Sequence, residues 1–318
     1  MDPRAFYVAG RPEHGTDQVT VRHPFDGHAV GTTTNATPEQ VEQAVNAAAA
    51  AAAPAAALPA HARAAALDHV SARLKERADE VARLITAENG KPLKWAHAEA
   101  ARAASTFRWA AEEARRFAGD LQRLDTDPAA TGRLAVVRRF PRGPVLGIAP
   151  FNFPLNLVAH KVAPAIAAGA PIVVKPAPAT PLTALLLGEI LAETDLPEGM
   201  FSVLPLPNER AAALVEDPRL PVVSFTGSGP VGAAIRNVAT ARLTSSAAHR
   251  SGLPFSAVII SATSSARSRS DLDTWSNAAA RTWAGVLRNG LTAASAAATA
   301  RSTCSAVGTQ TVATSSPS

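Results

Sequence analysis

The chain has 318 residues, of which 47% are hydrophobic, and its 31 Lys and Arg against 26 Asp and Glu give a formal net charge of +5. The arginines are scattered and do not alternate with aromatic residues, so the charge indicates no nucleic-acid partner. The single cysteine excludes an internal disulfide, and no apolar run suits a membrane span or a signal peptide. We therefore expect a cytoplasmic protein with a large core and no membrane partner.

A small antiparallel element is expected within residues 7–31. Short apolar runs at residues 19–21 and 29–30 are separated by a loop containing Asp-Gly, a dipeptide typical of hairpin turns. The sequence after it begins a helix, because Thr37 is placed as an N-cap and Gln40 completes a capping box. The N-terminal part is thus a hairpin followed by helices.

Ala-rich helices are expected next. The first should break near Pro54 and again near Pro59, because proline removes a backbone hydrogen-bond donor. Residues 67–87 repeat the helical period and are closed by Gly90, and residues 95–117 form a further long helix with a solvated charged face.

A strand of apolar and basic residues at 133–140, at a sheet edge or in an arm, precedes a different pattern. From residue 141 to 239, short apolar runs are followed by polar turns and then by helical patterns. The helical patterns cover residues 155–168, 181–194, 210–215 and 230–238. This alternation predicts an α/β fold with a parallel sheet and crossover helices, whose ligands bind at the carboxyl ends of the strands.

Three polar turns lie at those ends. Asn152 follows the first apolar run and either satisfies its own turn or donates a fixed hydrogen bond to a developing oxyanion. Lys175 ends the second run, where it either snorkels to the surface or meets a phosphate or ribose. Gly227-Ser-Gly229 is either a plain tight turn or a cradle for a pyrophosphate. The eight histidines are dispersed without ligand spacing, so no metal site is expected.

Six blocks together carry a family resemblance. They are Glu88-Asn-Gly-Lys-Pro92, Gly143-Pro-Val-Leu-Gly-Ile-Ala-Pro-Phe-Asn-Phe-Pro-Leu155, Pro164-Ala-Ile-Ala-Ala-Gly169, Val174-Lys-Pro-Ala-Pro-Ala-Thr-Pro181, Leu196-Pro-Glu-Gly-Met-Phe201 and Ser224-Phe-Thr-Gly-Ser228. In this order they resemble the NAD(P)-dependent aldehyde dehydrogenase superfamily over residues 16–239. Phe151 and the run after Phe153 are similar to the branch acting on lactaldehyde, glyceraldehyde phosphate or related small aldehydes.

The resemblance implies a Rossmann-like cofactor domain over residues 1–239, with a candidate oligomerisation arm at residues 122–142 and a homo-oligomer in the intact family. Asn152 would be the catalytic amide that stabilises the oxyanion. The implied cofactor-binding residues are Ile148, Ala149, Pro150, Phe151, Lys175, Pro178, Thr226, Gly227 and Ser228. The family often has Glu where this chain has Pro178, so NAD and NADP both remain open as cofactors.

The resemblance fails after residue 240, where Ser, Ala, Thr and Arg dominate. The family should show a Glu-Leu-Gly-Gly block, which supplies the general base, and then a cysteine in a Gly/Gln-rich loop. The segments at residues 246–254 and 282–290 have neither, and Cys304 lies too late in an unlike context. Only Val258-Ile-Ile260 indicates a strand there. One hypothesis is that residues 240–318 are translated from a shifted reading frame, and the rival is a genuine diverged tail.

Two functions follow from these observations. The first is NAD(P)-dependent oxidation of a small aldehyde to a carboxylate, in a form expected to be inactive because the nucleophile and base blocks are missing. The alternative is a pseudoenzyme that binds a nucleotide or a partner without catalysis.

Overall fold

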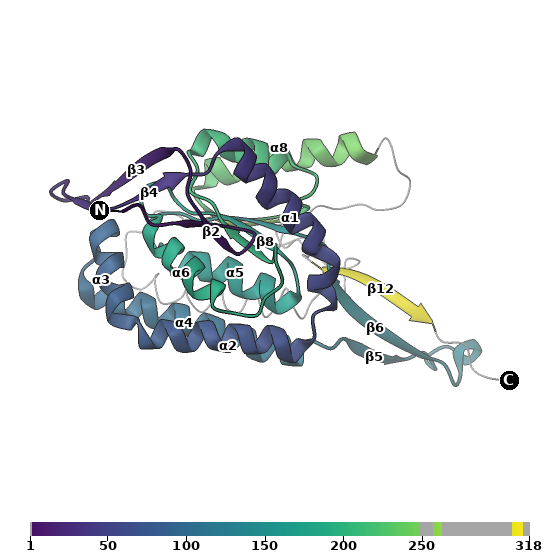
Figure 1. The fold of residues 1–318 in the computed structure, drawn as a ribbon. Helices are drawn as coiled ribbons and strands as arrows, with labels where there is room; N and C mark the ends of the chain where they lie inside the picture. The colour runs from purple at the N-terminus through teal and green to yellow at the C-terminus, as the bar shows by residue number, and fades with distance from the viewer. Residues whose placement is uncertain (1, 248–256, 263–306, 314–318) are drawn as a thin grey trace.

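A computed structural model describes residues 2–247, 257–262 and 307–313, which build an α/β fold around a seven-stranded sheet (Figure 1). The strands lie in the order β11 (Ala257–Ala262), β10 (Val222–Gly227), β7 (Val145–Ile148), β8 (Ile172–Lys175), β9 (Phe201–Val203), β1 (Phe6–Val8) and β2 (Arg11–Glu13). The first five are parallel, whereas β1 pairs antiparallel with β9 and with β2. The parallel sheet expected from the sequence is confirmed, including the strand at residues 258–260.

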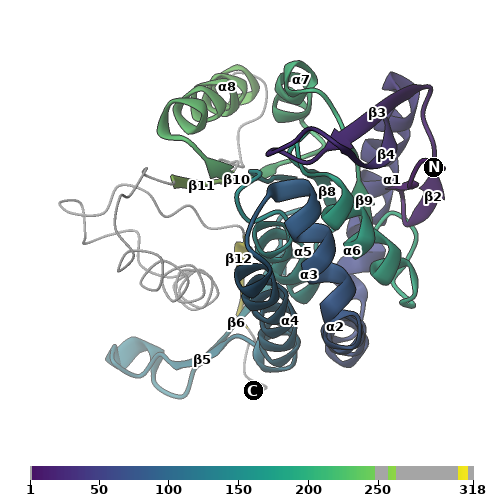
Figure 2. The same cartoon turned by 90° about the vertical axis from the view of Figure 1, so that its left-hand side faces the viewer.

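Helices cover both faces of this sheet (Figure 2). One face carries α1 (Pro38–Ala57), α7 (Ala211–Glu216) and α8 (Gly229–Ala247), and the other carries the crossover helices α5 (Asn156–Ala168) and α6 (Leu182–Ala192). A further layer, α2 (Ala60–Glu76), α3 (Ala78–Asn89) and α4 (Leu93–Arg116), packs against α5 and α6. Because β7 and β8 are buried throughout, their apolar runs show no polar alternation. Short 3-10 turns are η1 (Pro128–Ala130) and η2 (Asn208–Arg210).

The first helix confirms one expectation and corrects another. Its capping box is formed, with Gln40 N donating to Thr37 Oγ1 at 3.3 Å and Thr37 N donating to Gln40 Oε1 at 3.0 Å. The break expected at Pro54 is wrong, because α1 continues to residue 57 and stops just before Pro59. Pro54 is exposed, so water can satisfy the carbonyl that its ring leaves free, while buried Ala55 holds the next turn in the core.

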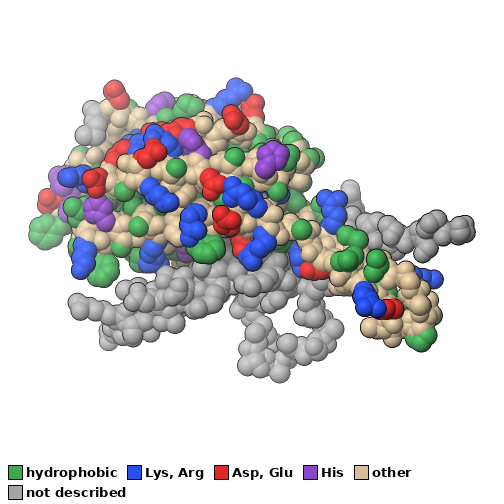
Figure 3. All heavy atoms as spheres, turned by 90° about the horizontal axis from the view of Figure 1, so that it is seen from below, with side chains coloured by type: hydrophobic (Ala, Val, Ile, Leu, Met, Phe, Trp, Pro, Cys, Tyr) green, Lys and Arg blue, Asp and Glu red, His purple; other side chains and the backbone are tan. Residues whose placement is uncertain are grey.

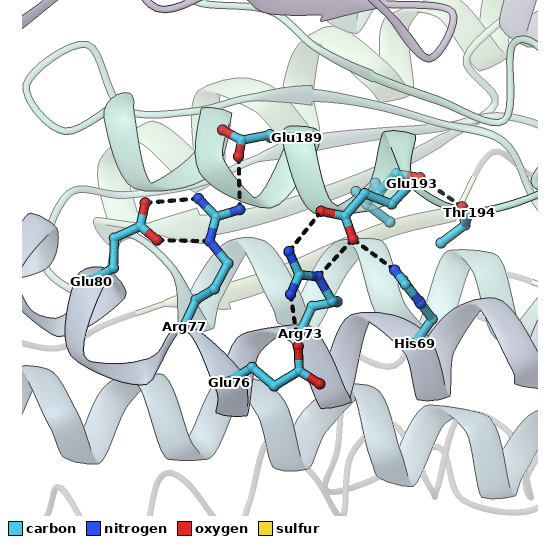
Figure 4. Close-up of polar contacts among 9 residues, drawn as sticks. His69, Arg73, Glu76, Arg77, Glu80, Glu189, Glu193 and Thr194 are labelled. Carbon is cyan, nitrogen blue, oxygen red and sulfur yellow. Dashed lines mark hydrogen bonds and ion pairs between the residues drawn. The ribbon is translucent and has the colours of Figure 1, made fainter.

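The helix expected over residues 67–87 is two helices, divided at Arg77. Its guanidinium donates to Glu80 on α3 and to Glu189 on α6, each at 2.7 Å, so one side chain ties the corner to the crossover helix (Figure 4). Arg73 on α2 bridges in the same way to Glu193, just after α6, at 2.8 Å. These ion pairs fix α2 and α3 against α6 below the sheet.

Two smaller sheets extend from the body. The expected hairpin is formed by β3 (Asp17–Arg22) and β4 (Ala29–Asn35). A three-stranded sheet contains β5 (Asp120–Arg123), β6 (Leu134–Pro141) and β12 (Val307–Ala313), and it projects away from the helices (Figure 1). Because β6 is its central strand, the expectation of an edge strand is wrong, and the expectation of an arm describes this segment better. Its role in oligomerisation stays a prediction.

The surface below the sheet mixes both signs of charge. Figure 3 shows Lys and Arg interspersed with Asp and Glu over this face, so the positive net charge is not gathered into one patch there. Among the helices of the described ranges, none has the length and apolar character needed to cross a membrane.

Candidate functional site

The carboxyl ends of β8, β7 and β10 form the edge where the sequence predicted a ligand. Ile148 is paired with Lys175 on one side and with Phe225 on the other, so the ends of three strands lie in one row. The chain runs from β7 outward to β8 and β9 and then returns to β10 on the other side of β7. In doubly wound sheets such a switch in direction opens a crevice, and ligands bind there. The candidate site is therefore at the ends of β7 and β10, with β8 on the other side of β7.

Lys175 is buried at the end of β8, so the alternative of a snorkelling surface lysine is wrong. Its Nζ donates to Asn208 Oδ1 at 2.9 Å, and Asn208 begins the 3-10 turn after β9. Burial lowers the pKa of Lys175 to about 8, and the nearby carboxylate of Glu209 opposes that shift. The ammonium is thus charged at neutral pH, and its hydrogen bond to the Asn208 side chain orients it.

Lys161 is a buried charged residue at the candidate site that the sequence analysis did not single out. It lies on α5 against Gly147 of β7, where a side chain in place of the glycine would meet Lys161 carbons at 3.3 and 3.4 Å. Its Nζ donates to Thr226 Oγ1 at 2.7 Å, at the carboxyl end of β10. Burial lowers the pKa of Lys161 to about 7. The available signal was a lysine within a largely apolar crossover helix, at residues 155–168 of the sequence.

The loop carrying Asn152 is held by a buried ion pair from outside it. Lys91 Nζ pairs with Glu99 Oε2 and also donates to the backbone oxygen of Asn152 at 2.9 Å. The same ammonium lies 3.9 Å from the centre of the Phe153 ring. Glu99 Oε1 accepts the N–H of Leu155 at 3.0 Å, at the start of α5. One carboxylate and one ammonium therefore fix both ends of this loop.

Asn152 itself has an unusual side chain. Its Oδ1 is buried and has no hydrogen-bond partner among the residues that the structure describes. If the Asn152 side chain only satisfied its own turn, its oxygen would accept a hydrogen bond within that turn. The unpaired Oδ1 therefore does not support this interpretation. Whether its amide meets an oxyanion remains a prediction.

Glu88 supports the turn after Lys175. It lies at the end of α3, is almost fully buried, and accepts the N–H groups of Leu182 at 2.7 Å and of Thr183 at 3.0 Å. It thus caps α6 from another helix, in place of a cap within the turn. Burial raises the pKa of Glu88 to about 7, against the opposing effect of these hydrogen bonds.

The turn between β10 and α8 is open. Ser228 and Gly229 are exposed, and a Cβ built on Gly229 would meet no atom of the described residues within 4 Å. A Cβ on Gly227 would instead lie 2.4 Å from the Phe225 ring. This open position lies in the first turn of α8, a helix of 19 residues, and backbone N–H groups at a helix N-terminus attract anions.

The remaining predicted residues differ in their exposure. Ile148 and Ala149 are buried, Pro150 is partly exposed, and Phe151 is 60% exposed. Pro178 is exposed two residues beyond buried Pro176. Cys304, residues 282–290 and most of residues 246–254 lie outside the described residues.

These residues fit a dinucleotide. Lys175 supplies a positive charge whose partner is a neutral amide, the Gly229 turn leaves space for a phosphate, and Asn152 has an unsatisfied polar atom at the end of β7. All three lie at the carboxyl edge of one parallel sheet, the place where such folds bind nucleotides. No metal is needed for this set of contacts.

Comparison with known proteins agrees with the fold. A family model described as aldehyde dehydrogenase family matches residues 11–269, which extends beyond residue 239 into the segment with β11. Aspartate-semialdehyde dehydrogenase 1 of Pseudomonas canavaninivorans is 38% identical over 221 residues, 70% of this chain and 47% of that protein. Mitochondrial succinate-semialdehyde dehydrogenase of Homo sapiens is 35% identical over 230 residues, 71% of this chain and 42% of that protein.

Solved structures give the same result. Aldehyde dehydrogenase 21 from Physcomitrella patens, in complex with the reaction product succinate, has a TM-score of 0.73 and 40% identity, covering 82% of this chain and 52% of that one. NADP-dependent glyceraldehyde-3-phosphate dehydrogenase from Bacillus halodurans, complexed with NADP, has a TM-score of 0.73 and 29% identity, with coverage of 82% and 53%. The chain spans about half the length of these relatives.

Proposed function

The chain belongs to the aldehyde dehydrogenase family, and on that premise we propose that residues 1–239 bind NAD or NADP. The observation that carries the proposal is the pairing of Lys175 with Asn208 at the same carboxyl edge of the sheet as the open Gly229 turn. The lysine would contact the adenosine ribose or its phosphate, and the N–H groups at the start of α8 would receive the pyrophosphate. Ile148 to Phe151 would line the nicotinamide.

In the reaction proposed for the intact protein, an aldehyde is oxidised to a carboxylate. A bound NAD(P) would supply the hydride acceptor at this edge of the sheet. The Asn152 amide would donate a hydrogen bond to the oxygen that becomes negative when the aldehyde carbon is attacked. Lys91 and Glu99 would keep that amide in place, because they hold the loop on both sides of it.

The substrate that we propose is a small aldehyde, of the semialdehyde kind that two relatives carry in their names. Those proteins are named for aspartate semialdehyde and succinate semialdehyde, in which a carboxylate accompanies the aldehyde. The branch indicated by Phe151 is an alternative supported by the glyceraldehyde-3-phosphate dehydrogenase neighbour. A homo-oligomer joined through residues 122–142 and a cytoplasmic location are part of the same proposal.

A second candidate is a nucleotide-binding pseudoenzyme. It is favoured by one feature of the sequence, since the chain has a single cysteine, Cys304, and no Glu after Glu216. Thioester chemistry needs a thiolate and a base for hydrolysis, so a chain without either in place would bind the cofactor and not turn over. The frame-shift hypothesis for residues 240–318 predicts the same behaviour.

One experiment separates the two candidates. NAD and NADP are titrated into the purified chain by calorimetry, and the same protein is assayed for nucleotide reduction with succinate semialdehyde and with glyceraldehyde 3-phosphate. Binding with turnover supports the enzyme, and binding without turnover supports the pseudoenzyme. If neither nucleotide binds, the proposed cofactor site is wrong. Translating the neighbouring reading frames around codon 240 tests the frame-shift hypothesis, which fails if no frame restores a Glu-Leu-Gly-Gly block and a later cysteine.

A further inference from the structure

The hairpin β3–β4 brings together three side chains that ligate metals. His23 and His28 lie at the two ends of the loop that joins the strands, and Asp26 lies between them. One nitrogen of each histidine and one oxygen of Asp26 all lie within 4.8 Å of one another. The expectation that no histidines share a ligand spacing is therefore wrong, because the turn folds the two ends onto each other.

The loop is built so that this proximity is enforced by the backbone. His23 N donates to the carbonyl of His28 at 2.9 Å, and Gly27 N donates to the carbonyl of His23 at 2.9 Å. Gly27 has a positive φ of 74°, a conformation that glycine adopts without strain. The backbones of His23 and His28 are thus hydrogen-bonded to each other at the base of a tight turn. These hydrogen bonds fix the distance between the two residues.

The ligand atoms are close to the spacing that a small cation requires. His23 Nδ1 lies 3.3 Å from Asp26 Oδ1, and tetrahedral zinc with bonds near 2 Å places its ligands roughly 3.3 Å apart. His28 Nδ1 lies 2.5 Å from the same oxygen, a hydrogen bond that an ion would replace. The His28 side chain is 57% exposed, so its ring is free to turn away from its stacking on His23.

The donor atoms of the cluster also suit a cation. Phe25 N donates to His23 Nδ1 at 3.3 Å, a long hydrogen bond that an ion would replace. Imidazole nitrogens with one carboxylate are the donor set of zinc and of the neighbouring divalent ions nickel and copper.

We propose that His23, Asp26 and His28 form a binding site for one divalent transition-metal ion, with Zn²⁺ as the ion, at the tip of the β3–β4 hairpin. The Nδ1 atoms of both histidines and Oδ1 of Asp26 are the protein ligands, and water completes the coordination because the loop is exposed. The site lies on a different sheet from the proposed nucleotide site, so it is independent of the proposed function.

The test is a calorimetric titration of Zn²⁺ into the full chain, expressed without a histidine tag and freed of metal with a chelator. We expect one ion per chain. His28→Ala and Asp26→Asn should each weaken binding by at least tenfold, because either removes one of three ligands. The matched control is His61→Ala, an exposed histidine on α2, which should leave binding unchanged.

Cu²⁺ gives a second measurement on the same protein. Its paramagnetic resonance spectrum should show two nitrogen ligands in the original chain and one in His28→Ala. Because His28 and Asp26 lie in an exposed loop and His61 is exposed on α2, circular dichroism should be unchanged in each variant. The proposal is overturned if the chain takes up no Zn²⁺, if His28→Ala and Asp26→Asn bind as tightly as the original chain, or if His61→Ala alone abolishes binding.

Discussion

The ammonium of Lys91 donates a hydrogen bond to the backbone oxygen of Asn152, across 61 positions of sequence and a distance of 2.9 Å. This contact joins the loop before α4 to the loop at the end of β7. Because the Glu99 side chain beneath it is fully buried, Lys91 is also the cation that neutralises that carboxylate. The loop geometry and the stability of the fold therefore depend on the same pair.

Replacing Lys91 by methionine should destabilise the protein by about 3–5 kcal/mol, because it leaves the Glu99 carboxylate buried without its cation. The double variant Lys91→Met, Glu99→Gln should recover part of that loss. Urea unfolding of the original chain, both single variants and the double variant measures this coupling. Additive effects of the two substitutions would show that the pair is not coupled.

Glu88 predicts a pH dependence of stability. Burial raises its pKa to about 7 in the folded chain, above the ordinary value of 4.5, so the folded state binds a proton more readily than the unfolded state. The contribution of Glu88 to the free energy of unfolding therefore falls as pH rises from 4.5 to 7. The original chain should lose stability relative to Glu88→Gln across that range, as measured by urea unfolding at pH 5 and 8. The opposite trend would mean that the hydrogen bonds from Leu182 and Thr183 outweigh burial.

Lys175 predicts a pH dependence of nucleotide binding. Burial lowers its pKa to about 8, and only the ammonium form attracts a phosphate or holds a ribose oxygen as a charged donor. NAD(P) affinity should therefore fall as pH rises from 7 to 9, and Lys175→Met should weaken binding by roughly tenfold or more and remove most of this dependence. Calorimetry at each pH measures both effects.

The control for that experiment is Lys75→Met, which removes an exposed lysine of α2. It should bind nucleotide like the original chain. If the Lys175→Met variant and the original chain bind nucleotide with equal affinity at pH 7, Lys175 is not part of the nucleotide site.

A substitution at Gly229 should weaken nucleotide binding and leave the stability of the fold nearly unchanged. A methyl group placed there meets no described atom, so Gly229→Ala should change the free energy of unfolding by less than about 0.5 kcal/mol. It would nevertheless stand in front of the first N–H groups of α8, and NAD(P) binding should weaken severalfold. Gly188→Ala is the contrasting variant, because its Cβ would lie 2.5 Å from the Tyr7 ring and should destabilise the fold. Unchanged nucleotide affinity in Gly229→Ala would place the pyrophosphate elsewhere.

The sequence was sufficient for the main sheet because its strands are short apolar runs followed by polar turns. Lys175 and Gly227 end two of these runs, and both lie at the predicted edge. Lys161 was missed because a lysine in a largely apolar helix does not by itself reveal its partner, and only the facing Gly147 and Thr226 explain its position. Pairing across the chain, such as that of Lys91 with Asn152, is likewise set by tertiary packing.

Local rules also failed where packing overrode them. Pro54 was expected to break α1, but buried alanines on both sides of it keep the helix intact. The histidines were expected to be dispersed without ligand spacing, but the turn between β3 and β4 brings His23 and His28 close to Asp26.

The pairing of β1 with β9 sets an order on the folding of the nascent chain. Tyr7 is paired with Val203, and Ala9 N donates to Ser202 Oγ across 193 positions. At synthesis rates of about 5–20 residues per second, the ribosome needs roughly 10–40 s to make that much chain. During that time β1 lacks β9, the strand with which it pairs on one side. The N-terminal strand can therefore complete its pairing in this sheet only after β7, β8 and β9 have been made.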